Sequence, residues 1–93
     1  WFIAKATEYA KARNVFGRVH AIASRLVDHV VLVPDTAIRA AQTRLWAETR
    51  LVAEPGGAAA LAALACGAYT PAPGERVGVL VCGANTTFDA LPA

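Results

Sequence analysis

An unbroken apolar run at residues 30–33, Val-Val-Leu-Val, limits the folds open to this chain more than any other feature. Branched aliphatic residues in a run that stops at Pro34 favour a short strand. The lack of apolar–polar alternation is typical of a strand that is covered on both faces, as in a parallel sheet flanked by helices. The run therefore predicts an α/β fold.

Most of the remaining chain is typical of helices. Helices are predicted over residues 3–13, 19–26, 36–50 and 58–66. Asp35 or Thr36 is a suitable N-cap for the third of these helices, and Gly67 is a suitable stop for the fourth. A proline-bearing loop is expected over residues 69–75 and a second strand over residues 76–81. The order strand, helix, helix, strand again predicts a parallel sheet.

Two of these helices differ in how their apolar residues are distributed. In the helix over residues 36–50, Ile38, Ala41 and Leu45 form an apolar stripe with Trp46 beside it. The side chains expected on or near its wetter side are Arg39, Gln42, Thr43 and Arg44. The helix over residues 58–66 is apolar on all sides, and we therefore expect it to be buried between layers.

The composition allows one small core. It also predicts that part of the surface is covered by residues outside this chain. Hydrophobic residues make up 56% of the 93 residues and charged residues only 17%, which is little charge for a free-standing domain of this size. The net charge of +2 and the lack of a basic stripe with interleaved aromatics argue against nucleic acid as a partner. The apolar part at residues 58–66 is far shorter than the roughly 20 residues that cross a bilayer, so no membrane partner is expected.

The two cysteines, Cys66 and Cys82, lie in apolar contexts that predict burial. Lone cysteines without a disulfide framework are typical of a reducing compartment, so a cytoplasmic location is expected. No cluster of histidine and cysteine has the spacing of metal ligands, and no metal site is predicted.

Two linked segments carry a family resemblance. Residues 51–60 read LVAEPGGAAA, and residues 74–85 read GERVGVLVCGAN. The first resembles the VxEPxGAA segment of the threonine and serine dehydratases, which are fold-type II pyridoxal-phosphate enzymes. The second resembles their late strand and (S/C)GGN turn, at the proper spacing. The resemblance extends over about residues 21–91.

The resemblance implies an incomplete three-layer α/β/α parallel-sheet domain of the tryptophan synthase β-like type. Residues 21–93 would be the C-terminal part of its catalytic domain, and residues 1–20 stay an unassigned helical segment. The implied cofactor is pyridoxal 5′-phosphate and the implied substrate a small amino acid. Threonine or serine would undergo β-elimination to a 2-oxo acid and ammonia.

The resemblance also assigns roles to individual residues. Cys82 matches the serine or cysteine whose side chain faces the pyridine nitrogen, as a neutral partner of the ring. Gly83 would let the backbone pass close to the ring, and Asn85 would hold the turn. Glu54 would lie near the cofactor, although a negative charge before a helix also suits the helix dipole. The sequence departs from the family pattern at Ala84, where the family usually has glycine.

No catalytic residue is assigned within this chain. The family's Schiff-base lysine lies in a Ser-x-Lys-like segment, whereas the lysines here are Lys5 and Lys11 in other contexts. The glycine-rich loop that binds the cofactor phosphate has no counterpart either. We therefore expect that the chain by itself neither binds the cofactor tightly nor turns over threonine, and that it needs the rest of a catalytic domain as its partner.

Two alternatives stay open. In the first alternative, the chain would be a non-catalytic truncated remnant that self-associates or packs on a larger partner, and its apolar composition would suit such an association. Otherwise it belongs to a fold-type II relative of different chemistry, a racemase or a β-replacing synthase, because these share the architecture. Homo-oligomer formation and the choice between threonine and serine are not determined by the sequence.

Overall fold

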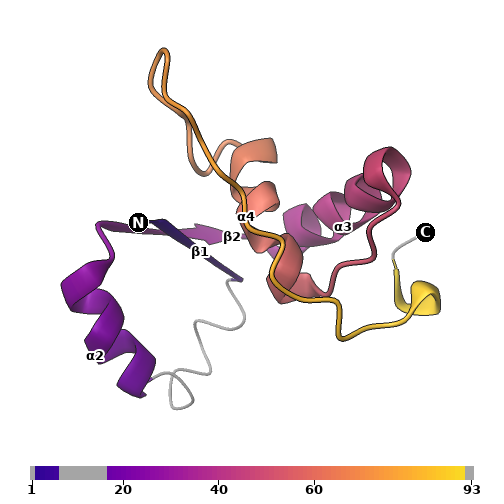
Figure 1. Cartoon of the computed structure of the whole chain (residues 1–93), viewed down its shortest axis with the longest axis horizontal. Helices are drawn as coiled ribbons and strands as arrows, with labels where there is room; N and C mark the ends of the chain where they lie inside the picture. Colours follow the sequence, from indigo (N-terminus) through magenta and orange to yellow (C-terminus); the bar gives the residue numbers. More distant parts are fainter. Residues whose placement is uncertain (1, 7–16, 92–93) are drawn as a thin grey trace.

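The computed structural model describes residues 2–6 and 17–91 of the chain (Figure 1). The elements in chain order are β1 (Phe2–Ala6), α2 (Gly17–Leu26), β2 (His29–Val33), α3 (Asp35–Thr49), α4 (Pro55–Ala65) and the short 3-10 helix η2 (Phe88–Ala90). Strand β2 and the three longer helices confirm the corresponding sequence predictions, although each helix begins one to three residues earlier than predicted.

The first strand contradicts the helix predicted over residues 3–13. β1 pairs in parallel with β2, in a register that sets Phe2 opposite His29 and Ala6 opposite Val33. Helix propensities of ordinary residues differ by only about 0.7 kcal/mol or less. A neighbouring strand that satisfies the backbone N–H and C=O groups outweighs so small a preference. The prediction is therefore wrong at residues 3–6, and residues 7–13 lie outside the described part.

The described sheet is parallel, as predicted, but β2 pairs with β1 and not with the strand predicted at residues 76–81. The two strands form one parallel ladder, and α2 lies between them in the sequence, which is the βαβ order of α/β folds. Helix α4 packs against both strands, and α3 packs against α4. The sheet, α4 and α3 thus follow one another in space. A larger sheet with helices on both faces is not present in the described residues and stays a prediction.

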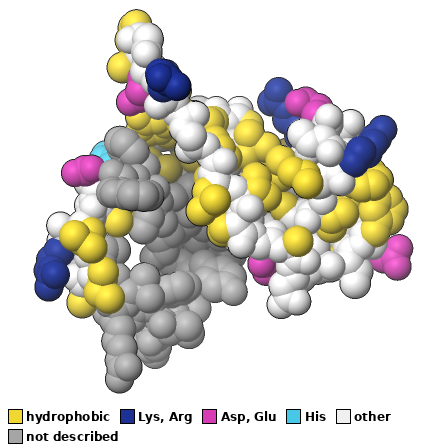
Figure 2. All heavy atoms as spheres, in the orientation of Figure 1, with side chains coloured by type: hydrophobic (Ala, Val, Ile, Leu, Met, Phe, Trp, Pro, Cys, Tyr) yellow, Lys and Arg dark blue, Asp and Glu magenta, His cyan; other side chains and the backbone are white. Residues whose placement is uncertain are grey.

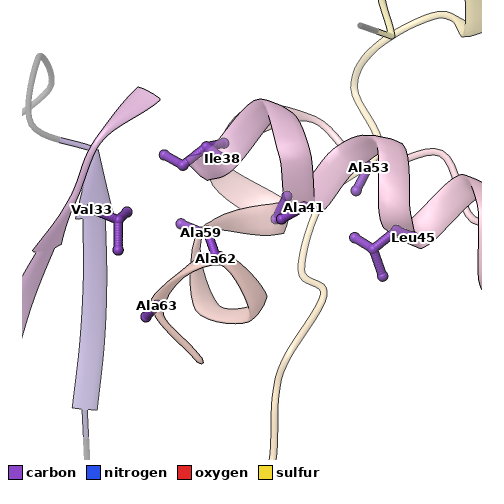
Figure 3. Close-up of a cluster of buried hydrophobic side chains, with 9 residues drawn as sticks. Val33, Ile38, Ala41, Leu45, Ala53, Ala59, Ala62 and Ala63 are labelled. Carbon is purple, nitrogen blue, oxygen red and sulfur yellow. The ribbon is translucent and has the colours of Figure 1, made fainter. Parts of the chain in front are cut away.

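The core lies between this sheet and the two helices (Figure 3). Its buried hydrophobic members are Val33, Ile38, Ala41, Leu45, Ala53, Ala58, Ala59, Ala62 and Ala63. Helix α4 contributes only alanines to this set, and their short side chains let the neighbouring backbones approach closely. In the part of the chain that the structure describes, no helix has both the length and the apolarity needed to cross a bilayer.

The coverage of β2 on both faces, which its apolar run predicts, is wrong for the described part. Val33 is fully buried and Val31 is partly buried against the core. Val30 and Leu32 point to the opposite face, since side chains alternate along a strand, and they are 48% and 53% exposed. The β2 side chains on this face are therefore apolar and exposed.

The second predicted strand, at residues 76–81, is also wrong. This segment has no regular secondary structure, and it pairs with neither β1 nor β2, the two described strands. A strand exists only through hydrogen bonds to a neighbouring strand, so an apolar sequence without a partner does not form one. Leu80 is 74% exposed, and the loop before this segment projects from the body of the molecule (Figure 1).

The N-cap predicted for α3 is wrong by one residue or more. Pro34 occupies the N-cap position in an extended conformation, and Asp35 already lies in the first turn. A carboxylate in the first turn still interacts favourably with the helix dipole. The end of α4 is as predicted, because Gly67 follows it with a positive φ of 79°.

Candidate functional site

The two segments that carry the resemblance meet at Glu54 and Gly83. The Glu54 N–H donates a hydrogen bond to the Gly83 carbonyl, with an N···O distance of 3.1 Å. A Cβ atom at Gly83 would overlap the Glu54 carboxylate, and one at Gly57 would overlap the Gly83 carbonyl. The two glycines thus permit a close approach between the start of α4 and the turn after residue 81.

Glu54 is the N-cap residue of α4. Its backbone is extended, with φ −69° and ψ 164°, and its carbonyl accepts a hydrogen bond from the Ala58 N–H at 3.1 Å. Its side chain is half-buried against Gly83 rather than bonded to the first turn of α4. The position before the helix suits a negative charge because of the helix dipole. Glu54 therefore has a clear structural role.

Cys82 lies one residue before this contact, and its side chain is exposed. Val81, the residue before it, is partly buried against the core, so the chain turns the valine inward and the thiol outward. The burial predicted for Cys82 is wrong. It is also wrong for Cys66, which caps the end of α4 and is exposed, with its sulfur 4.0 Å from the Ala63 carbonyl oxygen.

Asn85 lies at the centre of a tight turn. The Thr86 N–H donates to the Ala84 carbonyl at 2.7 Å, which closes a three-residue turn around Asn85. The side chain of Asn85 is exposed. The turn is thus formed by the backbone at the residue where the sequence predicts it, and the structure gives no role to the Asn85 amide.

The chain beyond the turn is anchored to α3 by aromatic residues. The rings of Trp46 and Phe88 meet edge to face, with 4.7 Å between centroids and an interplanar angle of 72°. The Arg50 guanidinium lies 5.4 Å from the Trp46 ring centroid. Edge-to-face pairs are favourable because the positive ring edge meets the negative face. Val81 on one side and Phe88 on the other therefore both hold the Cys82 turn.

Gln42 is a buried residue that the sequence prediction placed on or near the wetter side of α3. It is 4% exposed rather than on the wetter side of α3, and its Nε2 donates to the Ala53 carbonyl at 2.8 Å. The signal that would have found it is its spacing, because position 42 lies four residues after Ile38 and three before Leu45 on the same face. Arg39, Thr43 and Arg44 are exposed as predicted.

A separate pocket of about 350 Å³ lies between the later turns of α3 and α4. Its lining residues are Arg44, Leu45, Glu48, Thr49, Leu61, Leu64 and Ala65. None of them belongs to the Glu54–Gly83 contact. The Arg44 and Glu48 side chains in its wall form an exposed ion pair at 2.8 Å. This pocket and the Cys82 turn are thus distinct features.

Comparison with known proteins gives a family and two relatives. The family model described as pyridoxal-phosphate dependent enzyme matches residues 4–83, a range that includes both Glu54 and Gly83. A phenylserine dehydratase of Ralstonia pickettii is 47% identical over 62 residues, which are 67% of this chain and 19% of that protein. The chloroplastic biosynthetic threonine dehydratase 1 of Solanum lycopersicum is 42% identical over 71 residues, which are 75% of this chain and 12% of that protein. No solved structure matches the chain significantly.

Proposed function

The chain belongs to the pyridoxal-phosphate-dependent enzymes, and on this premise we propose that it forms the wall facing the cofactor ring in a dehydratase of β-hydroxy amino acids. In this proposal, residues 21–93 are the C-terminal part of the catalytic domain. The intact enzyme converts threonine or serine to a 2-oxo acid and ammonia. The chain spans only 19% and 12% of the two relatives, so the rest of the domain is its necessary partner.

The contact between Glu54 and Gly83 is the observation that supports this proposal most. It joins the two family-like segments through a backbone hydrogen bond and two close glycine contacts. The adjacent Cys82 thiol is left exposed at the turn. An exposed neutral thiol on a turn that is held in place is a suitable neighbour for a flat heteroaromatic ring.

The residues of this chain fit the cofactor as a binding wall. The cofactor, when bound, supplies the electron sink for removal of the α-proton of the amino acid. Cys82 would orient the ring by a hydrogen bond at its nitrogen, and Gly83, whose missing Cβ makes room for the Glu54 carboxylate, would hold the turn beside the ring. Since a thiol is a weak hydrogen-bonding group and not a carboxylate, it places no charge at that nitrogen. Glu54 would act through Gly83 by keeping the turn in place.

The names of the relatives support the substrate class. Phenylserine and threonine both carry a hydroxyl group on the β-carbon. Loss of this hydroxyl as water, followed by hydrolysis that replaces the nitrogen by oxygen, balances as amino acid giving 2-oxo acid and ammonia. We therefore propose a β-hydroxy amino acid as the substrate.

The exposed apolar side chains fit both the main proposal and a second one. Hydrophobic residues are visible on the molecular surface (Figure 2). The exposed ones include Val30 and Leu32 in β2 and Leu80 in the segment that follows α4. In the intact enzyme, the rest of the catalytic domain would cover them. A non-catalytic remnant would instead bury them by associating with itself or with another protein.

Release of 2-oxo acid from threonine and serine by the full-length protein tests the proposed function. Cys82→Ser keeps a neutral hydrogen-bonding group and should retain activity. Cys82→Ala should lower kcat by about tenfold or more, because the hydrogen-bonding partner of the cofactor ring nitrogen is lost. Cys66→Ala, at the other exposed thiol, is the matched control and should be neutral. Equal effects of the two alanine variants would refute the assignment of Cys82, and a full-length protein with no lyase activity would favour the remnant.

A further inference from the structure

One peptide group links α3 to the Cys82 turn. Gln42 Nε2 donates to the Ala53 carbonyl at 2.8 Å, and the Glu54 N–H donates to the Gly83 carbonyl at 3.1 Å. The Ala53 carbonyl and the Glu54 N–H belong to the same peptide unit. In a planar trans peptide these two groups point in opposite directions. Gln42 and Gly83 therefore hold this unit from opposite sides.

The burial of Gln42 indicates that its amide is needed for hydrogen bonding and not for packing alone. It is 4% exposed, and the residue whose carbonyl it contacts, Ala53, is fully buried. The other buried residues of the core in the described chain are hydrophobic. A buried amide is costly unless it forms hydrogen bonds, and an apolar side chain of similar size would fill the same space without that cost.

We propose that Gln42 is a positioning residue for the cofactor-facing turn, acting through the Ala53–Glu54 peptide on Gly83 and so on Cys82. The assignment of the ligand at Cys82 rests on the proposed function, whereas the coupling itself rests on the two hydrogen bonds. Without the Gln42 donor, the Ala53 carbonyl is buried and unpaired, and the peptide rotates toward another partner. The Glu54 N–H then turns away from Gly83, and the turn that carries Cys82 loses its fixed position.

Hydrogen bonds in sequence also strengthen one another. A donor at the carbonyl polarises the peptide and makes its N–H a better donor. Gln42 therefore fixes the orientation of the Ala53–Glu54 peptide and strengthens its bond to Gly83. Hydrophobic packing at the same position does neither.

The test compares Gln42→Leu with Ile38→Val in the full-length protein. Both changes lie on the buried face of α3, but only the first removes the donor. Hydrogen exchange of the peptide covering Glu54, and the alkylation rate of Cys82 in a Cys66→Ser background, are measured for each variant. Gln42→Leu should speed exchange at the Glu54 amide by about tenfold and change the Cys82 rate several-fold, since a buried hydrogen bond is lost. Ile38→Val should change both clearly less than Gln42→Leu does, since it trims packing but leaves the Gln42 hydrogen bond in place.

A second variant keeps the proposal testable if Gln42→Leu does not fold. In Gln42→Glu the neutral carboxyl can donate to the Ala53 carbonyl, but the carboxylate cannot. Protection of the Glu54 amide should therefore be near wild type at low pH and be lost as pH rises. Equal protection in Gln42→Leu and Ile38→Val, or a pH-independent Gln42→Glu, would overturn the coupling. If Gln42→Leu speeds exchange at the Glu54 amide but leaves the absorption band of the bound cofactor unchanged, the coupling holds and the cofactor assignment is refuted.

Discussion

Substitution of Gly57 by alanine tests the contact that joins the two family-like segments. A Cβ at this position would overlap the Gly83 carbonyl oxygen and lie 3.0 Å from the Gly83 nitrogen. These are backbone atoms, so no side chain can rotate away to relieve the overlap. Overpacking of this kind costs about 1–3 kcal/mol. Loss of the Glu54–Gly83 hydrogen bond adds about 1 kcal/mol.

Gly56 provides the matched control. It also lies in the first turn of α4, and a Cβ there would meet nothing within 4 Å. Alanine is favoured over glycine in a helix by about 0.5–1 kcal/mol, and this gain applies to both variants. The free energies of unfolding of Gly57→Ala and Gly56→Ala should therefore differ by about 2–4 kcal/mol, with Gly57→Ala less stable.

Urea unfolding of the full-length protein measures this difference. Unfolding is followed by tryptophan fluorescence, and the midpoints are compared at equal slopes. We expect a lower midpoint for Gly57→Ala and an unchanged or higher one for Gly56→Ala. If Gly57→Ala were as stable as Gly56→Ala, the start of α4 and the Gly83 turn would not be in contact, and the site described above would be wrong.

Three further outcomes are expected. Gly83→Ala should destabilise the protein less than Gly57→Ala, because the overlapping Glu54 carboxylate is the end of a flexible side chain. Adding Glu54→Ala to Gly83→Ala should relieve most of that cost. Additive effects of the two changes on the free energy of unfolding would contradict the contact. The Tyr69 hydroxyl shares its one proton between the two carboxylate oxygens of Glu75, at 2.7 and 2.6 Å, and this hydrogen bond raises the pKa of Tyr69. The bond stabilises the neutral phenol, so its contribution to the stability of the loop is full below the ordinary tyrosine pKa and is lost as pH rises through the raised pKa. Ultraviolet titration should show a lower Tyr69 pKa in Glu75→Gln. An unchanged pKa would exclude the bond in solution. The isolated 93-residue chain should release no 2-oxo acid from threonine in the presence of pyridoxal 5′-phosphate, and detectable turnover would show that its own lysines are sufficient.

The sequence predicts the elements that are determined by neighbouring residues or by a regular apolar pattern. Helix α3 follows from its apolar stripe, and the end of α4 follows from Gly67. The apolar run at β2 is long enough to be recognised as a strand without knowledge of its partner. In each of these cases the determining residues lie close together in the chain.

The elements that depend on distant partners were not predictable in the same way. β1 overlaps a segment, residues 3–13, whose composition favours a helix, and it is a strand because it pairs with β2. Residues 76–81 have the composition of a strand and pair with no described strand. Strand formation depends on which segments meet, and a single sequence does not contain that information in its local pattern.

The candidate site shows the same division. The motifs indicated Glu54, Cys82, Gly83 and Asn85 as a group, and the structure brings Glu54 and Gly83 into contact. The role of Gln42 was not predictable from its polarity, since a glutamine on a surface helix usually faces water. Only the position of the buried Ala53 carbonyl explains why an amide lies in the core.

Alkylation of the two exposed thiols, with and without cofactor, tests most directly that the Cys82 turn borders the cofactor ring. The rate at each cysteine of the full-length protein is followed by mass spectrometry, before and after saturation with pyridoxal 5′-phosphate. Bound cofactor should slow modification of Cys82 by about tenfold or more through loss of access and leave Cys66 unchanged. Equal rates at Cys82 in the two states, with the cofactor demonstrably bound, would contradict the account.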